Sequence, residues 1–194
     1  MHIRFATKED LPHMLEIYRP YVENTTVSFE YVCPSLEEFT GRFTSYTRQF
    51  PWLVWEDEGE VLGYAYACAP FTRTAYQWVA ETSVYLRRDA HRKGIGTSLY
   101  KALEAILTKQ GYLTVYALVT SENTSSLAFH QAVGYEIRAN FPRQGFKMGK
   151  ALGVIWLEKV LQFVNYPQNS PLSAQDLVKI DRNFLDNLDR FALS

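Results

Sequence analysis

Two glycines one residue apart, Gly94 and Gly96, follow a strand-like run and a basic turn and open a segment with helical periodicity. A strand-to-helix turn of this kind directs free backbone N–H groups toward an anion, and the helix dipole favours negative charge there. The glycines let phosphate oxygens approach the backbone, and Arg92 and Lys93 add positive charge. The turn is therefore predicted to bind a diphosphate, the structural alternative being a plain connection with a solvated basic loop.

This turn matches neither of the two common nucleotide patterns. A Rossmann fingerprint requires a third glycine three residues after the second, but Leu99 occupies that position and the next glycine is Gly111. The sequence also contains no Walker A motif. A diphosphate-binding turn outside both patterns favours coenzyme A as the ligand.

Two further side chains could transfer protons. Glu81 stands in the otherwise uncharged, aromatic run 78–86, where partial desolvation would raise its pKa toward the range of a general base. His130 lies seven residues after Asn123, two turns along the same expected helix, and a histidine can donate a proton near neutral pH. The structural alternatives are an exposed or arginine-paired carboxylate, a half-buried helix histidine and, for Asn123, a simple N-cap.

The elements that would position these residues follow from hydrophobic periodicity. Strands are expected over 3–6, 52–56, 61–69, 78–86, 113–119, 135–139 and 154–160. Helices are expected after the capping residues Thr7 and Ser35, over 94–110 and over 123–133. The order β-α-α-β-β-β-α-β-α-β-β indicates an α/β protein whose consecutive hairpins exclude an all-parallel sheet.

The composition is ordinary for a globular domain. The chain has 194 residues, 47% of them hydrophobic, and a formal net charge of -1, which argues against nucleic acid as a partner. Its two cysteines, Cys33 and Cys68, form neither a disulfide framework nor a metal set, so we expect a cytoplasmic location and no metal. No run approaches the length of a membrane span, and the first residues lack the apolar core of a signal peptide.

The end of the chain is expected to be an extension. Residues 166–171 have linker composition, and Ser173 would cap a last helix with an apolar stripe of Leu177, Ile180, Phe184, Leu188 and Phe191. The sequence therefore divides into a domain over 1–162 and a linker with an amphipathic helix over 163–194. The stripe must be buried, either on the same domain or against a second subunit, and its periodicity does not choose between them.

Taken together, these motifs resemble the GCN5-related N-acetyltransferase (GNAT) superfamily. In that family a strand leads through R/Q-x-x-G-x-G/A into a helix, and the later pattern N-x-x-[A/S]-x-x-x-[Y/H]-x-x-x-G-[F/Y] is matched by residues 123–135. Marks of the phosphinothricin acetyltransferase-like branch are Ile17, Tyr18, Val22, Thr25, Ser28 and Phe29, then 63–67, Phe71, Arg73, Ala75, Tyr76 and Trp78, then Glu81, Ser83–Tyr85 and 145–147. The resemblance covers about residues 1–160 and implies a mixed, mostly antiparallel sheet with splayed central strands, flanked by helices.

The resemblance also implies acetyl-CoA as the co-substrate, without a metal. The implied cofactor-binding residues are Val84, Tyr85 and Leu86 for the pantetheine arm, Arg92, Lys93, Gly94, Ile95, Gly96 and Thr97 for the pyrophosphate, and Asn123 and Ser126. Glu81 would deprotonate the acceptor ammonium, directly or through a water, and His130 would protonate the leaving thiolate. Relatives in this branch commonly form homodimers, so a homodimer is predicted, with the C-terminal stripe favoured as a subunit contact.

On the acceptor side, the resemblance points to Phe29, Arg73, Tyr76 and Trp78. The bidentate fork of Arg73 is suited to a carboxylate or phosphinate, so we expect a small amine of the phosphinothricin or methionine sulfoximine type. The chain departs from the branch at Ala151 and Gly153, where the branch has Trp and Asp, and at His91, where the family has Arg or Gln.

Two other functions remain open at this point. An acetyltransferase for a protein N-terminus or a polyamine would use the same machinery, although Arg73 argues against a polycation. A non-catalytic acyl-CoA-binding module would need the glycine turn, but it would need neither Glu81 nor His130.

Overall fold

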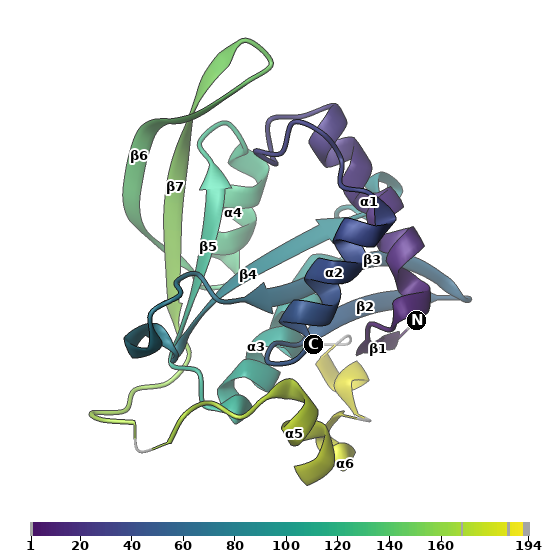
Figure 1. The fold of residues 1–194 in the computed structure, drawn as a ribbon, viewed down its shortest axis with the longest axis vertical. Coiled ribbons are helices and arrows are strands. Elements are labelled where there is room, and N and C mark those ends of the chain that lie inside the picture. The colour runs from purple at the N-terminus through teal and green to yellow at the C-terminus, as the bar shows by residue number, and fades with distance from the viewer. Residues whose placement is uncertain (1, 168, 186, 192–194) are drawn as a thin grey trace.

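The computed structural model describes residues 2–167, 169–185 and 187–191, which form one seven-stranded sheet with helices on both faces (Figure 1). The strands are β1 (His2–Phe5), β2 (Trp52–Asp57), β3 (Glu60–Cys68), β4 (Val79–Leu86), β5 (Thr114–Thr120), β6 (Glu136–Lys147) and β7 (Lys150–Val160). The helices are α1 (Leu11–Glu23), α2 (Leu36–Tyr46), α3 (Ile95–Gln110), α4 (Thr124–Ala132), α5 (Ala174–Ile180) and α6 (Arg182–Leu185), with short 3-10 turns η1 (Lys8–Asp10), η2 (Thr74–Tyr76), η3 (Arg88–Ala90) and η4 (Leu188–Phe191). Among these described helices, none has the length and apolar character that crossing a membrane requires.

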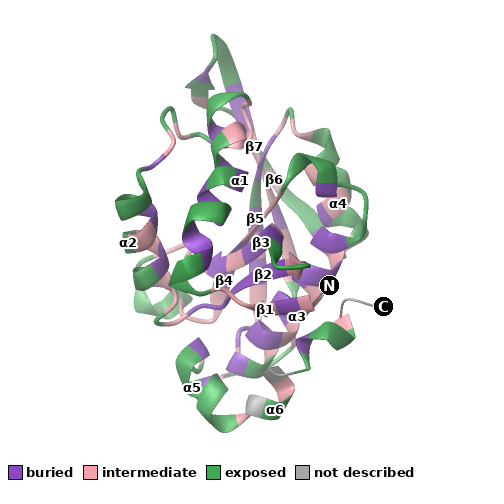
Figure 2. Cartoon of the chain, turned by 90° about the vertical axis from the view of Figure 1, so that its right-hand side faces the viewer, coloured by how far each residue is buried: buried purple, intermediate pink, exposed green. Residues whose placement is uncertain are grey.

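Alternation along β2 explains why the sheet has a core on each face. Trp52 and Val54 pack with α1 and α2, whereas Leu53 and Trp55 pack with α3. In Figure 2 the buried residues of α1 and α2 face the sheet and their exposed residues lie on the outer side. The helices therefore cover both faces of the strands that carry the site.

The strand order is β1-β2-β3-β4-β5-β7-β6, and β4 with β5 is the one parallel pair in the described sheet. Their pairing is confined to residues 79–81 and 114–116, after which the two strands diverge. The predicted mixed, mostly antiparallel sheet with splayed central strands is confirmed.

The β6–β7 hairpin is longer than the strands expected over 135–139 and 154–160. It turns at Met148 and Gly149, which have φ of +50° and +74° and make the tight two-residue connection. Two register shifts in β6 interrupt its alternation of side chains. Because of these irregularities, the apolar and polar residues of β6 do not alternate regularly, so the sequence pattern did not predict the full length of the strand.

The C-terminal extension packs on the chain's own domain. The Ser173 hydroxyl caps the first turn of α5 as predicted, but the expected single helix is divided into α5, α6 and η4. Leu177 and Leu188 are buried in the same core cluster as α3, and Phe184 and Phe191 pack against it partly buried. Ile180 is 68% exposed, so the prediction that the whole stripe is buried was wrong for this residue. Asp189 accepts a hydrogen bond from the Ile3 N–H of strand β1 at 2.6 Å. These contacts correspond to the first of the two alternatives for the apolar stripe, burial on the same domain, and not to the favoured subunit contact.

Candidate active site

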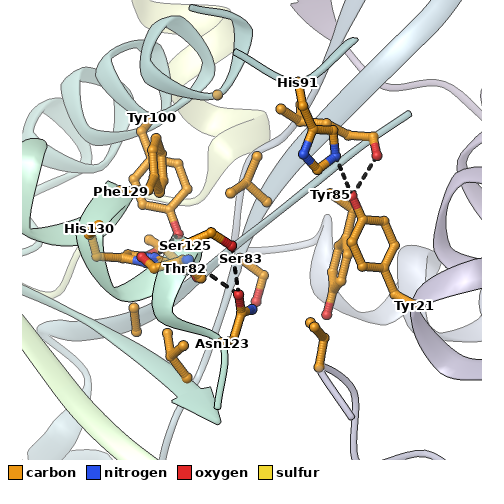
Figure 3. A pocket seen from close by; sticks show the side chains of 18 of the residues that line it. Tyr21, Thr82, Ser83, Tyr85, His91, Tyr100, Asn123, Ser125, Phe129 and His130 are labelled. Carbon is orange, nitrogen blue, oxygen red and sulfur yellow. Dashed lines mark hydrogen bonds between the residues drawn. The ribbon is translucent and has the colours of Figure 1, made fainter. Parts of the chain in front are cut away.

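The divergence of β4 and β5 opens a cleft of about 730 Å³ (Figure 3). Its walls come from α1 and the loop that follows, from β4 and β5, from the turn before α3, and from α4. The Arg87 N–H bonds to the Leu62 carbonyl of β3 at 2.8 Å, so alternation turns the backbone groups of Leu86 and Val84 the opposite way, toward the cleft. This part of β4 offers an edge that β5 does not use.

One acceptor on that edge is held by α1. The Tyr21 hydroxyl donates to the Leu86 carbonyl at 2.6 Å, and the His91 Nε2 lies 2.9 Å from the same hydroxyl (Figure 3). Because the single Tyr21 proton lies on Leu86, the His91 ring donates to the Tyr21 oxygen. His91 therefore fixes Tyr21 at the wall of the cleft, and the Leu86 N–H is the backbone group available to a ligand.

The turn before α3 has the backbone shape of an anion cradle. Arg92 and Gly94 are both left-handed, with φ of +60° and +80°, and α3 begins without a side-chain cap. The N–H groups of its first turn therefore lack helical partners and can bind an anion. A Cβ on Gly94 would meet no atom within 4 Å, so the space in front of the turn is open. A diphosphate fits this turn.

Ten of the eleven predicted cofactor residues line the cleft: Val84, Tyr85, Leu86, Arg92, Gly94, Ile95, Gly96, Thr97, Asn123 and Ser126. The eleventh, Lys93, is exposed and lies outside that lining. The Asn123 side chain accepts a hydrogen bond from the Ser126 N–H at 3.2 Å, so it is the N-cap of α4 while it also faces the cleft.

Glu81 lies where the two central strands begin to part. It is the last residue of β4 that pairs with β5, and it directly precedes Thr82, which lines the cleft. Burial raises the pKa of the Glu81 carboxyl, and among the described residues neither a hydrogen bond nor an ion pair favours its charged form. A carboxylate whose pKa is raised in this way is a stronger base than an exposed one, as general-base catalysis requires.

His130 is buried at the cleft, and both of its ring nitrogens are bonded. Its Nδ1 lies 2.8 Å from the Ser126 carbonyl, which can only accept, so Nδ1 carries a proton. Its Nε2 lies 2.9 Å from the Tyr100 hydroxyl, and Tyr100 also lines the cleft. Burial lowers the pKa of His130, so the neutral ring accepts the Tyr100 proton.

Sequence reasoning missed Tyr21 and Tyr100. Tyr100 lies four residues after Gly96, on the same face of α3, and that spacing could have identified it. For Tyr21 the sequence carries no comparable signal, because its partner Leu86 lies 65 residues further along the chain.

The predicted acceptor residues are not part of the cleft lining. Phe29 lies in the loop after α1, with its ring so close to Gly145 that a Cβ there would be 2.6 Å from it. Arg73 and Tyr76 belong to the connection between β3 and β4; Arg73 is exposed and, in the described chain, has no ion-pair partner. These residues therefore belong to separate segments outside the cleft lining, and their part in acceptor binding stays a prediction.

The fourth predicted acceptor residue, Trp78, contacts the C-terminal extension. Its indole N–H donates to the Asn169 carbonyl at 3.0 Å. This hydrogen bond joins Trp78 to the C-terminal extension. The part of Trp78 in acceptor binding stays a prediction.

Comparison with known proteins identifies the family. The model of the acetyltransferase (GNAT) domain matches residues 3–156. The chain belongs to the GNAT acetyltransferase family. Within the described residues, no group of three or more His, Cys, Asp or Glu side chains is placed to hold a metal ion.

Individual relatives narrow the assignment. The chain is 34% identical over 149 residues to phosphinothricin N-acetyltransferase of Streptomyces viridochromogenes, covering 77% of this chain and 81% of that protein. It is 36% identical over 160 residues to L-methionine sulfoximine/L-methionine sulfone acetyltransferase of Pseudomonas paraeruginosa, covering 80% and 92%. A GNAT superfamily phosphinothricin acetyltransferase from Sinorhizobium meliloti, solved in complex with AcCoA, matches with a TM-score of 0.83 and 34% identity over 90% of this chain and 96% of that one. The predicted branch, the N-acetyltransferase activity and acetyl-CoA as co-substrate are confirmed.

Proposed function

We propose that the acceptor of this acetyltransferase is the amine of a small amino acid analogue of the phosphinothricin or methionine sulfoximine type. The observation that supports acetyl transfer at this site is the placement of the anion cradle and of Glu81 at the two ends of one strand segment. From Leu86 back to Glu81 the strand spans about 17 Å, at roughly 3.3 Å per residue. An acyl arm laid along this edge from the cradle brings its thioester toward Glu81.

The cofactor is bound mainly by backbone groups in this proposal. The left-handed turn at Arg92 and Gly94 holds the pyrophosphate, and the free edge of Val84 and Leu86 pairs with the pantetheine arm like an added strand. Asn123 and Ser126 contact the arm from α4. This binding mode depends little on the side chains that differ from the family, such as His91.

Glu81 supplies the base. An acceptor ammonium gives one N–H proton to the Glu81 carboxylate, directly or through a water, and the neutral amine then attacks the thioester carbonyl. A backbone N–H of the β4 edge stabilises the oxyanion. Because burial raises the pKa of Glu81, the protonated carboxyl formed in this step is a stable state of the site.

His130 and Tyr100 supply the acid. The C–S bond breaks as the intermediate collapses, and the sulfur takes a proton from the Tyr100 hydroxyl, which is hydrogen-bonded to His130. After the attack the nitrogen of the intermediate carries one proton too many; as the sulfur gains the Tyr100 proton, the nitrogen loses this proton to the Tyr100 oxygen, so the Tyr100–His130 pair ends in its initial protonation. His130 then acts through Tyr100 on the thiolate.

The acceptor class is supported by the two named relatives and by Arg73. An exposed arginine without an ion-pair partner among the described residues is available to bind a carboxylate or phosphinate by its two parallel N–H groups. Ala151 and Gly153 stand where the branch has Trp and Asp, so the preferred member of the class is expected to differ from phosphinothricin itself.

We also infer a homodimer in the cytoplasm. The β6 edge strand and its turn expose the apolar side chains of Ile137, Phe141, Phe146 and Met148, which a second copy would cover. Both cysteines are free thiols, as a reducing compartment allows. Light scattering in solution tests the dimer, and a monomer would contradict it.

The function is tested by thiol release from acetyl-CoA with a panel of acceptors: phosphinothricin, methionine sulfoximine, methionine sulfone, proteinogenic amino acids, an N-terminal peptide and spermidine. Turnover is expected with the first three and is expected to be unchanged by a chelator. Acetyl-CoA should also raise the melting temperature. Turnover restricted to the peptide or spermidine would replace the proposed acceptor class, and no thermal shift at millimolar acetyl-CoA would contradict cofactor binding.

A further inference from the structure

Lys147, the last residue of β6, is a buried lysine with an unusual pair of partners. Its side chain is only 4% exposed. Its ammonium donates to the Val22 carbonyl at 2.6 Å and to the Ser28 carbonyl at 2.7 Å. One cation therefore joins the β6–β7 hairpin to the end of α1 and to the loop that follows, 125 and 119 residues away in the chain.

The physical chemistry of this contact makes it specific. Val22 lies in the last turn of α1, where carbonyl groups lack helical partners and the helix dipole is negative. Within the described residues, no carboxylate lies at ion-pair distance from Lys147, and burial lowers its pKa. The charged form is thus held by the two carbonyls, and their loss would leave it unsatisfied.

Two neighbours of Lys147 hold the same loop. The Tyr31 hydroxyl donates to the Phe146 carbonyl. The Phe29 ring packs on Gly145 so closely that a Cβ at that position would be 2.6 Å from it. Three consecutive hairpin residues, 145–147, which we call the loop clamp, therefore contact the first part of the loop after α1, residues 24–31, at Ser28, Phe29 and Tyr31.

This loop borders both halves of the site. Thr25 and Val27 line the cleft that takes the cofactor. Phe29, two residues further on, is one of the predicted acceptor residues. Ser28, whose carbonyl Lys147 holds, stands between them, and its hydroxyl is bonded to Tyr18 of α1 at 2.7 Å. Because Ser28 and Phe29 are adjacent in the chain, a displacement of the Ser28 backbone would also displace Phe29.

We propose that Lys147 is a positioning residue for the acceptor, which holds the loop over 24–31 so that Phe29 presents one fixed wall to the incoming amine. The inference rests on the proposed function, because it assigns Phe29 to the acceptor side. It differs from a general stabilising role in what it predicts: the acceptor KM changes much more than the acetyl-CoA KM.

The first experiment compares Lys147→Met, which keeps the length of the side chain, with Lys179→Met at an exposed lysine of α5 that pairs with Asp176. Lys147→Met is expected to raise the acceptor KM about tenfold or more, because small displacements of positioning groups have large kinetic effects. The acetyl-CoA KM should rise much less, although Thr25 and Val27 of the loop line the cofactor cleft. Amide hydrogen exchange over 24–31 should become faster with Lys147→Met and stay unchanged with Lys179→Met.

Two milder variants cover the case in which Lys147→Met fails to fold. Tyr31→Phe removes one clamp contact from an exposed side chain, and Gly145→Ala pushes on the Phe29 ring. Both should raise the acceptor KM and leave the acetyl-CoA KM alone.

The outcomes separate this inference from the proposed function. Unchanged loop exchange in Lys147→Met, or an equal rise of both KM values, would overturn the role of Lys147. A wild-type chain that acetylates none of the phosphinothricin-type acceptors would overturn the proposed acceptor class, while the exchange measurement would still decide whether the loop clamp exists.

Discussion

The cofactor side and the acceptor side of the site are assembled from different kinds of structure. On the proposed cofactor side, the edge of β4, the turn and the start of α3 form one continuous segment, 84–97, which offers mainly backbone groups. On the proposed acceptor side, Phe29, Arg73 and Lys147 come from three segments that are distant in the sequence, and their proposed roles depend on side chains. A backbone cradle tolerates sequence change, whereas an acceptor wall of separate side chains can be altered one residue at a time. The variants below test that contrast.

The largest effect is expected where the two sides meet, at Glu81. Glu81→Gln should lower kcat by about 10²- to 10⁴-fold, the usual scale for loss of a general base, and leave acetyl-CoA affinity almost unchanged. Because burial raises the pKa of Glu81, wild-type activity should fall as the pH drops through that pKa, when the carboxyl becomes protonated and can no longer accept. The variant should lack this acid limb, measured as kcat/KM against pH. Activity within about threefold of wild type would place the base elsewhere.

A change confined to the cofactor side comes next. Gly96→Val should raise the acetyl-CoA KM roughly tenfold to a hundredfold, the equivalent of one lost hydrogen bond to a charged group, with the acceptor KM unaffected. A Cβ on Gly96 would be in ordinary contact with Phe129 at 3.4 Å, so folding should survive. Gly94 is less suitable, because its φ of +80° adds backbone strain to any substitution.

The matched control is Gly41→Val in α2, where a Cβ would meet nothing within 4 Å. Equal losses of stability and acetyl-CoA affinity in Gly96→Val would instead mark the turn as structural.

A change confined to the acceptor side should raise the acceptor KM and leave the acetyl-CoA KM unchanged, the opposite of the result expected for Gly96→Val. Arg73→Gln is expected to raise the acceptor KM about tenfold by removing a bidentate contact to a carboxylate or phosphinate, at constant acetyl-CoA KM. Arg73→Lys should recover part of the loss, since it keeps the charge without the fork. Arg48→Gln, at another exposed arginine, serves as control. An unchanged acceptor KM would remove Arg73 from the site.

The smallest effect is expected at Trp78. This variant tests whether Trp78 belongs to the acceptor side or only stabilises the fold. Trp78→Phe removes the bond to Asn169 and should lower stability by about 1 kcal/mol, or roughly 2–4 °C in melting temperature. Both KM values should stay near those of wild type. A shift of the acceptor KM without a thermal shift would return Trp78 to acceptor binding.

The sequence brought together ten residues that line one cleft because the signals for them are local. Gly94 and Gly96 lie between a strand and a helix that periodicity identifies, and the left-handed φ of Gly94 is what a glycine at a helix start allows. His130 follows Asn123 along one helix, so their common face could be inferred from spacing alone. Tyr100 shows the limit of such reasoning, because an aromatic side chain in an apolar stripe has the same pattern whether it fills the core or borders a cleft.

The acceptor side was harder to predict because its contacts are long-range. Lys147 meets Ser28 across 119 residues, and Trp78 meets Asn169 across 91. The hairpin that carries Lys147 was also hidden, since the bulges in β6 break the alternation by which strands are recognised. The assignments of Phe29, Arg73 and Tyr76 came from resemblance, and they stay predictions.

The hydrogen bond from Ile3 to Asp189 also bears on how this protein avoids aggregation. β1 is an outer strand of the sheet, and a strand in that position can recruit another chain through its free backbone groups. The Asp189 carboxylate accepts a hydrogen bond from one of those groups, the Ile3 N–H, and adds a negative charge to the edge. Asp189 is synthesised 186 residues after Ile3. During synthesis, β1 therefore lacks this hydrogen bond until almost the whole chain has emerged. Partly made or C-terminally clipped chains should therefore be more prone to associate than the full chain.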